Sequence, residues 1–199
     1  AAIIGAPNAG KSTLVNRLTG SKVSIVTQKV QTTRFPVRGI AMEGRAQIIL
    51  VDTPGIFAPS RRLESAMVRA ASAGIADADL VLLLLDVRKG IDANARLALA
   101  QLERERRRAF LVINKIDLPS AQPEKYAEEL ANLIGVEPEE VLKVSGKTGE
   151  GVPELLDRVV DLIPSPSSPS GASATGADAP ARALIFDSVY DTYRGVVTY

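Results

Sequence analysis

The segment from Gly5 to Ser12, GAPNAGKS, has glycine, lysine and serine at the spacing of a phosphate-binding loop. Gly5 allows the chain to leave a strand in a tight turn, and Gly10 lets the backbone approach an anion because no Cβ intervenes. We expect Lys11 to reach the β- and γ-phosphates of a nucleotide and the Ser12 hydroxyl to bind Mg²⁺. Further phosphate contacts are predicted for the backbone amides of Asn8, Ala9, Gly10, Lys11, Ser12 and Thr13.

The segment Asp52-Thr53-Pro54-Gly55 follows a predicted strand, at the edge where ligands bind in open α/β sheets. Its carboxylate, Asp52, can hold Mg²⁺ through water, and the Gly55 amide can contact the γ-phosphate. A solvated turn is the alternative interpretation of this segment.

The segment Asn114-Lys115-Ile116-Asp117 predicts which base is bound. The Asp117 carboxylate offers two acceptor oxygens to the N1–H and amino group of guanine, a donor pair that adenine lacks. Charge-assisted hydrogen bonds contribute about 1.5–3 kcal/mol each, so two of them select the base. The Lys115 stem can cover the base plane, and Asn114 can join this loop to the phosphate loop. A weaker motif, Ser145-Gly146-Lys147, offers amides to guanine O6, and taken alone it is equally an ordinary loop.

A metal-sensing hydroxyl is expected between the first helix and Asp52. Thr32 and Thr33 lie there, and we favour Thr33, next to Arg34, as the residue that closes on Mg²⁺ and the γ-phosphate. Thr32 is the alternative, and both residues can instead be ordinary surface threonines. The predicted metal set is therefore Ser12, Thr33 and Asp52.

The hydrophobic pattern places these motifs between alternating strands and helices. Strands are expected at residues 1–4, 37–42, 46–52, 80–87, 109–113 and 141–144, and helices at 12–18, 61–75, 93–106, 123–134 and 151–163. This alternation predicts an α/β fold with a mostly parallel sheet and helices on both faces.

Composition excludes several kinds of chemistry. The 199 residues carry a net charge of +1 and include no cysteine and no histidine, which excludes disulfides, thiolate metal sites and histidine bases. Both absences suit a reducing compartment. The longest apolar run, Leu80 to Leu85, is too short to span a bilayer, and we see no signal peptide. The initial alanine and short first strand lead us to expect further residues before position 1.

The composition changes after residue 163. Residues 164–181 are rich in Pro, Ser, Gly and Ala and are expected to form a flexible linker. Residues 182–199 are rich in apolar side chains and predict a strand, a turn and a second strand, the truncated start of a β-barrel-like domain. We therefore expect a nucleotide-binding domain at 1–163, a linker at 164–181 and a partial β domain at 182–199.

The front of the chain, about residues 1–105, resembles the Era family of ribosome-assembly GTPases. The resemblance rests on GAPNAGKSTLVNRLTGSKVSIVTQKVQTTR, on Gly39-Ile40 and on DTPGIF at 52–57. The back, about residues 113–199, resembles the LepA (elongation factor 4) family instead, through NKIDLPSA, VLKVSGKTGEGVPELLD and ARALIFDSVYDTYRGVV. The junction lies near residues 104–113.

The Era resemblance implies a Ras-like P-loop GTPase domain that hydrolyses GTP to GDP and phosphate with Mg²⁺ and acts in small ribosomal subunit assembly. It also implies a cytoplasmic monomer, although this chain has no stretch long enough for the RNA-binding KH domain of that family, so any contact with ribosome or rRNA is indirect. The LepA resemblance implies a ribosome-dependent translational GTPase as the alternative. A third hypothesis is a guanine-nucleotide-binding fragment without effector coupling. The basic run 104–108 can contact RNA or be a solvated helix end.

The resemblance also predicts how hydrolysis is assisted. Ile56 occupies the position after Gly55 where Ras-like enzymes carry glutamine, so no side chain there positions water. Asn8 matches the asparagine with which related GTPases hold K⁺ at the phosphates, and a hydrogen bond that shapes the loop is the alternative. The predicted catalytic set is Lys11, Asn8, Thr33 and Gly55.

Overall fold

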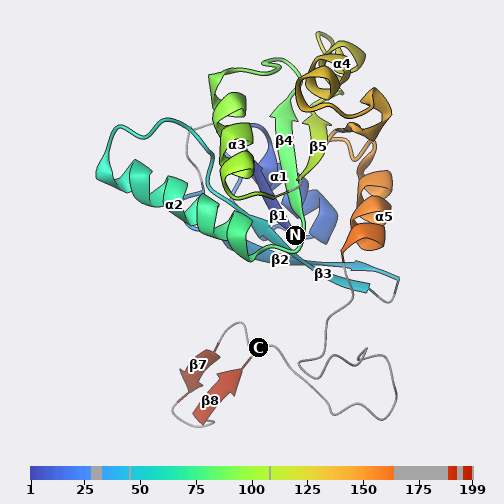
Figure 1. Cartoon of the computed structure of the whole chain (residues 1–199). Coiled ribbons are helices and arrows are strands. Elements are labelled where there is room, and N and C mark those ends of the chain that lie inside the picture. The colour runs from blue at the N-terminus through green and yellow to red at the C-terminus, as the bar shows by residue number, and fades with distance from the viewer. Residues whose placement is uncertain (28–32, 45, 108, 164–187, 192–194, 199) are drawn as a thin grey trace. The chain divides into compact units, whose positions relative to one another are not determined.

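The computed structural model describes residues 1–27, 33–44, 46–107, 109–163, 188–191 and 195–198. Most of these residues belong to one α/β unit, 1–163 (Figure 1). Its strands are β1 (Ala2–Gly5), β2 (Val37–Glu43), β3 (Ala46–Asp52), β4 (Val81–Asp86), β5 (Ala109–Asn114) and β6 (Leu142–Val144). Its helices are α1 (Lys11–Thr19), α2 (Arg62–Asp77), α3 (Ala93–Arg104), α4 (Pro123–Ile134) and α5 (Val152–Leu162), with a short 3-10 helix η1 (Pro138–Glu140).

The six strands form one sheet in the order β2-β3-β1-β4-β5-β6. Adjacent strands are parallel except for the edge strand β2, which is antiparallel to β3. A parallel sheet needs helical crossovers and is buried on both faces, which explains the continuous apolar sequence of β4. The prediction of a mostly parallel α/β sheet is confirmed.

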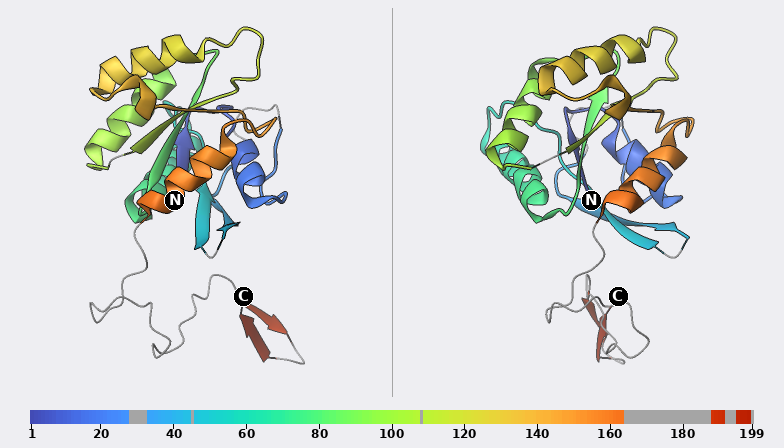
Figure 2. Two further views of the ribbon diagram at one scale, coloured as in Figure 1. Left: turned by 90° about the vertical axis from the view of Figure 1, so that its right-hand side faces the viewer. Right: turned by 45° about the vertical axis from the view of Figure 1, so that its right-hand side comes forward.

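Helices cover both faces of the sheet and create two hydrophobic clusters. Side chains of α1 and α5 pack on one face with Ile3, Leu82 and Leu84. Side chains of α2, α3 and α4 pack on the other face with Ile4 and Leu83. The views in Figure 2 show these two helical layers on either side of the sheet. Alternate residues of one strand therefore serve opposite clusters, as the period of a strand requires.

The register of the strands brings the predicted motifs to one edge of the sheet. Gly5 lies opposite Leu84, Asp86 lies opposite Asn114, and Asn114 lies opposite Val144, which precedes Ser145. The phosphate loop, the end of β4 and both base-side loops therefore begin at neighbouring points. This is the carboxyl-end arrangement in which open α/β sheets bind ligands.

One local expectation was wrong, and one short element was not predicted. The helix predicted to reach Arg106 ends at Arg104, because Arg106 adopts a left-handed backbone (φ 51°) that a helix cannot continue through. The helix η1 was not predicted, because three residues beginning with proline are too short for a periodic hydrophobic pattern. None of the described helices is long and apolar enough to cross a membrane.

The second compact unit comprises residues 164–199. Its described part is a hairpin in which β7 (Ser188–Asp191) pairs antiparallel with β8 (Gly195–Thr198). The predicted linker, 164–181, lies outside the described residues. Its role as a linker and the start of a β-barrel-like domain after it remain predictions.

Two glycines with almost the same backbone conformation test how tightly α5 packs on the sheet. Gly151 (φ 69°) caps the start of α5, and a Cβ there would lie 2.1 Å from the Lys143 carbonyl oxygen. Gly20 (φ 65°) caps the end of α1 and has nothing within 4 Å of such a Cβ. Both substitutions to alanine carry the left-handed penalty of about 1 kcal/mol. We expect Gly151→Ala to lower the free energy of unfolding by about 1–3 kcal/mol more than Gly20→Ala, measured by urea denaturation. Equal losses would contradict the close approach.

Candidate nucleotide-binding site

A pocket of about 400 Å³ opens at the carboxyl edge of the sheet. The phosphate loop forms its floor, and residues from the segment after α1, from the end of β3 and from the ends of β4 and β5 form its walls. The lining residues are Pro7, Asn8, Gly10, Lys11, Ser12, Thr13, Ile25, Val26, Thr27, Thr33, Thr53, Gly55, Arg88 and Lys115.

Lys11, the first residue of α1, is buried under the phosphate loop. Its Nζ donates hydrogen bonds to the carbonyls of Gly5 (3.2 Å) and Ala6 (2.9 Å). Burial disfavours the charged ammonium and lowers the pKa of Lys11 from 10.5 to about 8, an effect that the charge of Asp52 opposes. A desolvated cation that faces a pocket is a strong attractor for an anion.

Ser12, Thr33 and Asp52 form a hydroxyl–carboxylate cluster beside Lys11. The Ser12 hydroxyl donates to Asp52 Oδ2 at 2.6 Å and lies 3.1 Å from the Thr33 hydroxyl, which in turn donates to Asp52 Oδ2 at 3.3 Å. Asp52 is fully buried, and its Oδ1 has no hydrogen-bond partner among the described residues. Mg²⁺ prefers oxygen ligands, with few from the protein and the rest from water and phosphate, so this donor set fits the ion.

The structure brings the predicted metal residues together. Thr33 lies at the cluster, as favoured over Thr32, which is outside the described residues. The side chains of Asp52 and Ser12 meet although 40 positions separate them, because α1 begins beside the end of β3. Their role as metal ligands remains a prediction.

Asn114 connects the phosphate loop to the base-side loops. Its Nδ2 donates to the Ala9 carbonyl at 2.8 Å, and its Oδ1 accepts the Gly146 amide at 3.0 Å. Gly10 must remain without a side chain here, because a Cβ would lie 2.3 Å from Asn114 Nδ2. This contact is a second reason for the glycine, besides the approach to an anion.

Asp117 and Ser145 lie side by side at the base end of the site. The Ser145 hydroxyl donates to Asp117 Oδ1 at 2.7 Å and accepts the Thr148 amide at 3.0 Å. This pairing orients the Asp117 carboxylate, and no hydrogen bond to its other oxygen occurs among the described residues. Gly146 is buried beside α1, whereas the Lys147 side chain is exposed.

The remaining predicted residues lie as follows. Gly55 packs against Pro7, since a Cβ there would approach the proline ring to 2.9 Å. Ile56 is buried in the cluster under α2 and α3, so its side chain cannot enter the pocket. Asn8 is exposed at the rim with a left-handed φ of 63°, and its side chain has no hydrogen-bond partner in the described chain. The Asn8 carbonyl accepts Lys115 Nζ at 2.7 Å, so a hydrogen bond that shapes the loop does occur at this residue through its backbone.

Sequence reasoning missed three residues of the site. Asp86, the last residue of β4, accepts hydrogen bonds from Arg88 and from Lys115, described further below. Asn16 in α1 holds the segment after the helix: its Oδ1 accepts the amides of Val23 (2.9 Å) and Ser24 (2.8 Å). An aspartate at the end of a buried strand was the available signal for Asp86, although it predicts no particular contact, whereas an asparagine in a helix carried none.

The sheet order and the loop from Gly5 to Ser12 define a P-loop nucleotide-binding domain. Residues 1–115 match the family model described as a 50S ribosome-binding GTPase. This match spans more than half of the chain, and the chain belongs to that GTPase family.

Relatives of two kinds match the sequence. GTPase Era of Afipia carboxidovorans is 50% identical over 163 residues, which are 82% of this chain and 53% of that protein. Elongation factor 4 of Corynebacterium aurimucosum is 48% identical over 181 residues, which are 87% of this chain and 27% of that protein. The chain therefore spans about half of the Era relatives and about a quarter of the elongation factors. The suspected double resemblance is confirmed.

Solved structures agree with this assignment. A variant of Aquifex aeolicus Era bound to GDP and AlF₄⁻ superposes with a TM-score of 0.76 at 32% identity, over 83% of this chain and 57% of the other. The bacterial selenocysteine-specific elongation factor EF-Sec covers 99% of this chain and 33% of its own, with a TM-score of 0.67. At 21% identity the second likeness shows the fold alone.

The burial of Lys11 predicts an unusual dependence of stability on pH in the nucleotide-free protein. The folded pKa of about 8 lies below the unfolded value of 10.5, so the unfolded chain binds more protons in this window. Stability that is lost to the buried charge below pH 8 is therefore regained as the pH rises toward 10.5. We expect Lys11→Met to be more stable than wild type by about 1–2 kcal/mol at pH 7, and less so at pH 10, in urea denaturation.

The matched control for this prediction is Lys125→Met, a change on the outer face of α4, which should not alter the pH dependence. A Lys11→Met variant that is less stable than wild type at pH 7, or a difference that does not change with pH, would contradict the cost assigned to the buried ammonium.

Proposed function

We propose that this chain binds and hydrolyses GTP as a switch domain of the Era type. The observation that carries the proposal is the pair of hydrogen bonds in which the Asn114 side chain donates to the Ala9 carbonyl and accepts the Gly146 amide. This pair joins the phosphate loop to the guanine-selecting loops in one site. Phosphate recognition and base recognition then act on a single ligand, a guanine nucleotide.

In this proposal Lys11 leaves its two loop carbonyls for the β- and γ-phosphates, and the amides from Asn8 to Thr13 surround the phosphate oxygens. Ser12 and Asp52 hold Mg²⁺, Asp52 through water, and Thr33 joins them when GTP is present. The ion supplies charge neutralisation at the phosphates when it is bound. Hydrolysis is in-line attack of water on the γ-phosphorus, and the protein contributes position and charge.

We further propose that Asn8 holds K⁺ against the phosphates. Its exposed side chain lies at the rim of the pocket with no competing partner among the described residues. Since Ile56 is buried under α2 and α3, no side chain at that position orients the attacking water. Intrinsic turnover should therefore be slow and should depend on a cation or on a partner.

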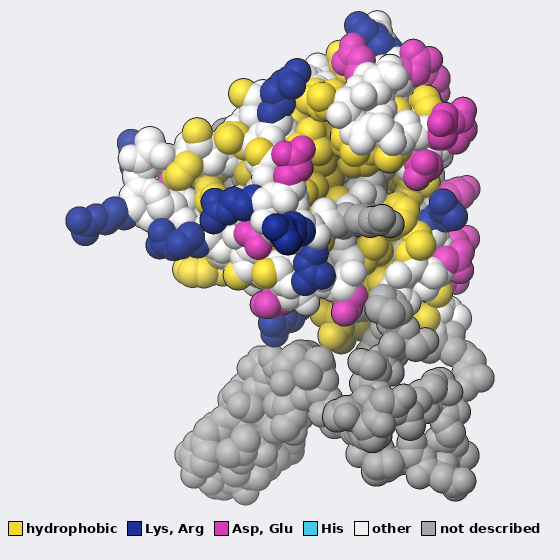
Figure 3. Space-filling model, in the orientation of Figure 1, with side chains coloured by type: hydrophobic (Ala, Val, Ile, Leu, Met, Phe, Trp, Pro, Cys, Tyr) yellow, Lys and Arg dark blue, Asp and Glu magenta, His cyan; other side chains and the backbone are white. Residues whose placement is uncertain are grey.

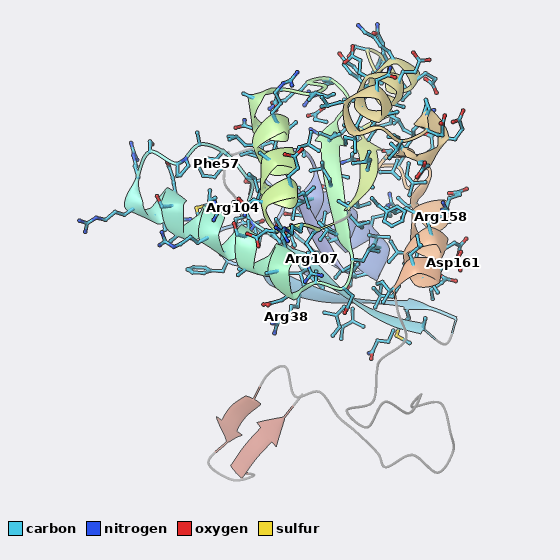
Figure 4. All side chains as sticks on the ribbon, in the orientation of Figure 1. Arg38, Phe57, Arg104, Arg107, Arg158 and Asp161 are labelled. Carbon is cyan, nitrogen blue, oxygen red and sulfur yellow. The ribbon has the colours of Figure 1, made fainter. Side chains whose placement is uncertain are left out.

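The proposed partner is the small ribosomal subunit or its RNA. We also propose that the protein acts in the cytoplasm and as a monomer. One of the Era structures similar to this chain contains nucleotides 1506–1542 of 16S ribosomal RNA, with a TM-score of 0.71 at 33% identity. In this chain, Lys and Arg side chains gather over α2 and the end of α3 (Figure 3). Arg104 and Arg107 lie there on the same side as Arg38 (Figure 4), although Arg107 also binds the Ala76 carbonyl of α2. This surface supports contact with RNA phosphates more than the overall charge of +1 suggests.

A ribosome-dependent elongation-type GTPase is the second candidate. The similarity to elongation factor 4 favours it, because that alignment covers 87% of the chain against 82% for Era. The buried Ile56 favours the Era type, because elongation factors of that class carry a histidine at this position. A guanine-nucleotide-binding fragment without an effector is the third candidate.

Asp117→Asn tests the base assignment. Asparagine presents an amide donor where guanine needs an acceptor, so affinity should move from guanine toward xanthine nucleotides by at least tenfold. Competition of GDP and xanthosine diphosphate against a fluorescent nucleotide measures the shift. Asp157→Asn on the exposed face of α5 is the control. Unchanged affinity for GDP in Asp117→Asn would disprove the base-selecting role.

GTP turnover in KCl and in NaCl, with and without purified small ribosomal subunits, tests the switch. We expect K⁺ to raise turnover severalfold over Na⁺, and subunits to raise it further. Asn8→Ala should remove the K⁺ effect without abolishing GDP binding. Stimulation by complete 70S ribosomes but not by small subunits would favour the elongation-type candidate. Tight GDP binding with no stimulation by either would favour the fragment.

A further inference from the structure

Asp86 joins two cations at the edge of the nucleotide pocket. Its Oδ2 accepts Lys115 Nζ at 2.5 Å and Arg88 Nη2 at 2.9 Å, and its Oδ1 accepts Arg88 Nε at 3.2 Å and the Arg88 amide at 3.0 Å. The Asp86 side chain is 2% exposed. Burial opposes its ionisation, but the hydrogen bonds from Arg88 and Lys115 outweigh that effect and lower the pKa of Asp86 to about 2. The carboxylate is therefore charged at every physiological pH.

Arg88 and Lys115 carry two positive charges and Asp86 carries one negative charge, so a net charge of +1 remains at this edge of the pocket. Lys115 shares its ammonium between Asp86 and the Asn8 carbonyl at 2.7 Å, and it belongs to the base-side loop. Arg88 belongs to no motif of the site. Its side chain is 49% exposed and lines the pocket.

Arg88 keeps hydrogen-bonding capacity toward the pocket. A guanidinium has five N–H donors, and the Asp86 carboxylate takes only Nε–H and one N–H of Nη2. The remaining three have no partner among the described residues. A guanidinium anchored on one side by a two-point contact is restricted in orientation, so less entropy is lost when its free side binds an anion.

The residues that line the pocket beside Arg88 indicate which part of a bound guanine nucleotide its side chain faces. The lining includes Asn8 and Gly10 to Thr13 of the phosphate loop, whereas Asp117, Ser145 and Gly146 of the base side are not among the lining residues. A planar guanidinium also matches the oxygens of a phosphate group. The edge of the guanine base is already assigned to the Asp117 carboxylate, so the phosphates are the better partner for Arg88.

We propose that Arg88 is a further nucleotide-binding residue that donates to the phosphates, and that Asp86 is the positioning residue that holds it and Lys115 in place. This inference rests on the proposed binding of guanine nucleotide and adds a phosphate contact that the motifs predicted from the sequence do not contain. Asp86 then couples the two halves of the ligand, because the cation on the base loop and the cation on the phosphate side share its carboxylate.

The test compares Arg88→Ala with Lys89→Ala, since Lys89 is the next residue, is exposed and does not line the pocket. Affinities for GDP, GTP and guanosine are measured by competition with a fluorescent GDP in NaCl, which separates the effect from that of K⁺. Arg88→Ala should lower affinity for GDP and GTP about tenfold and leave guanosine unchanged, and Lys89→Ala should change none of them. Arg88→Lys, which keeps the charge but loses the two-point contact, should fall between.

The same variants reveal how Asp86 acts. Asp86→Asn should weaken GDP binding, and the double variant Asp86→Asn/Arg88→Ala should lose less than the sum of the two single losses. Thermal unfolding of nucleotide-free Arg88→Ala at the wild-type temperature confirms that the fold is intact. Wild-type affinity for GDP in Arg88→Ala, or an equal loss for guanosine, overturns the inference. Failure of the wild-type chain to bind any guanine nucleotide instead overturns the proposed function on which it rests.

Discussion

The side chain of Asn114 is the contact on which the geometry of the site depends. Its side-chain amide binds Ala9 in the phosphate loop and Gly146 in the base-side loop. Both partners are backbone groups, and no other side chain makes these two contacts among the described residues. Asn114 itself is held at the end of β5, opposite Asp86 of β4. A buried amide whose donor and acceptor are both used fixes the distance between the loops, since breaking either bond would leave a buried polar group unpaired. The absence of a side chain at Gly10 then follows from the position of Asn114.

Asn114 is stabilising because its buried polar groups are paired, whereas the buried charge of Lys11 is destabilising in the free protein. The protein buries an ammonium group among backbone carbonyls, and burial lowers its pKa to about 8. Asp52 is buried nearby with one oxygen unpaired in the described chain. Both groups are costly in the free protein, and both costs would fall if an anion and a hard cation occupied the pocket as proposed. Folding stability is reduced where ligand affinity is needed, a common trade-off at functional sites.

The fold and most of the site could be predicted because their signals are local. Each motif follows an apolar strand, and parallel strands must bring their carboxyl ends to one edge, so Lys11, Asp52, Asn114 and Asp117 were placed together without coordinates. The choice of Thr33 over Thr32 rested on its place next to Arg34 and stays a prediction, although the Thr33 hydroxyl does lie 3.1 Å from the Ser12 hydroxyl. The role of Asp86 was missed for a related reason: its partner Lys115 is 29 positions away, and an aspartate at the end of a strand predicts no particular contact.

The double resemblance to Era and to elongation factor 4 raises the question of how two sequence types can share one core. Charge differs sharply between two stretches of this chain: residues 1–108 contain 17 Lys and Arg against 9 Asp and Glu, whereas residues 109–163 contain 5 against 11. The core is not divided in this way. One hydrophobic cluster combines Ile3 and Leu14 with Val144 and Leu155, and the other combines Leu83 with Ile113 and Leu130. Packing in both clusters is set by the strand register and helix positions of the shared fold, which both families must preserve to build the same nucleotide site. Surfaces carry no such constraint, so the two parts can differ there while their interiors fit.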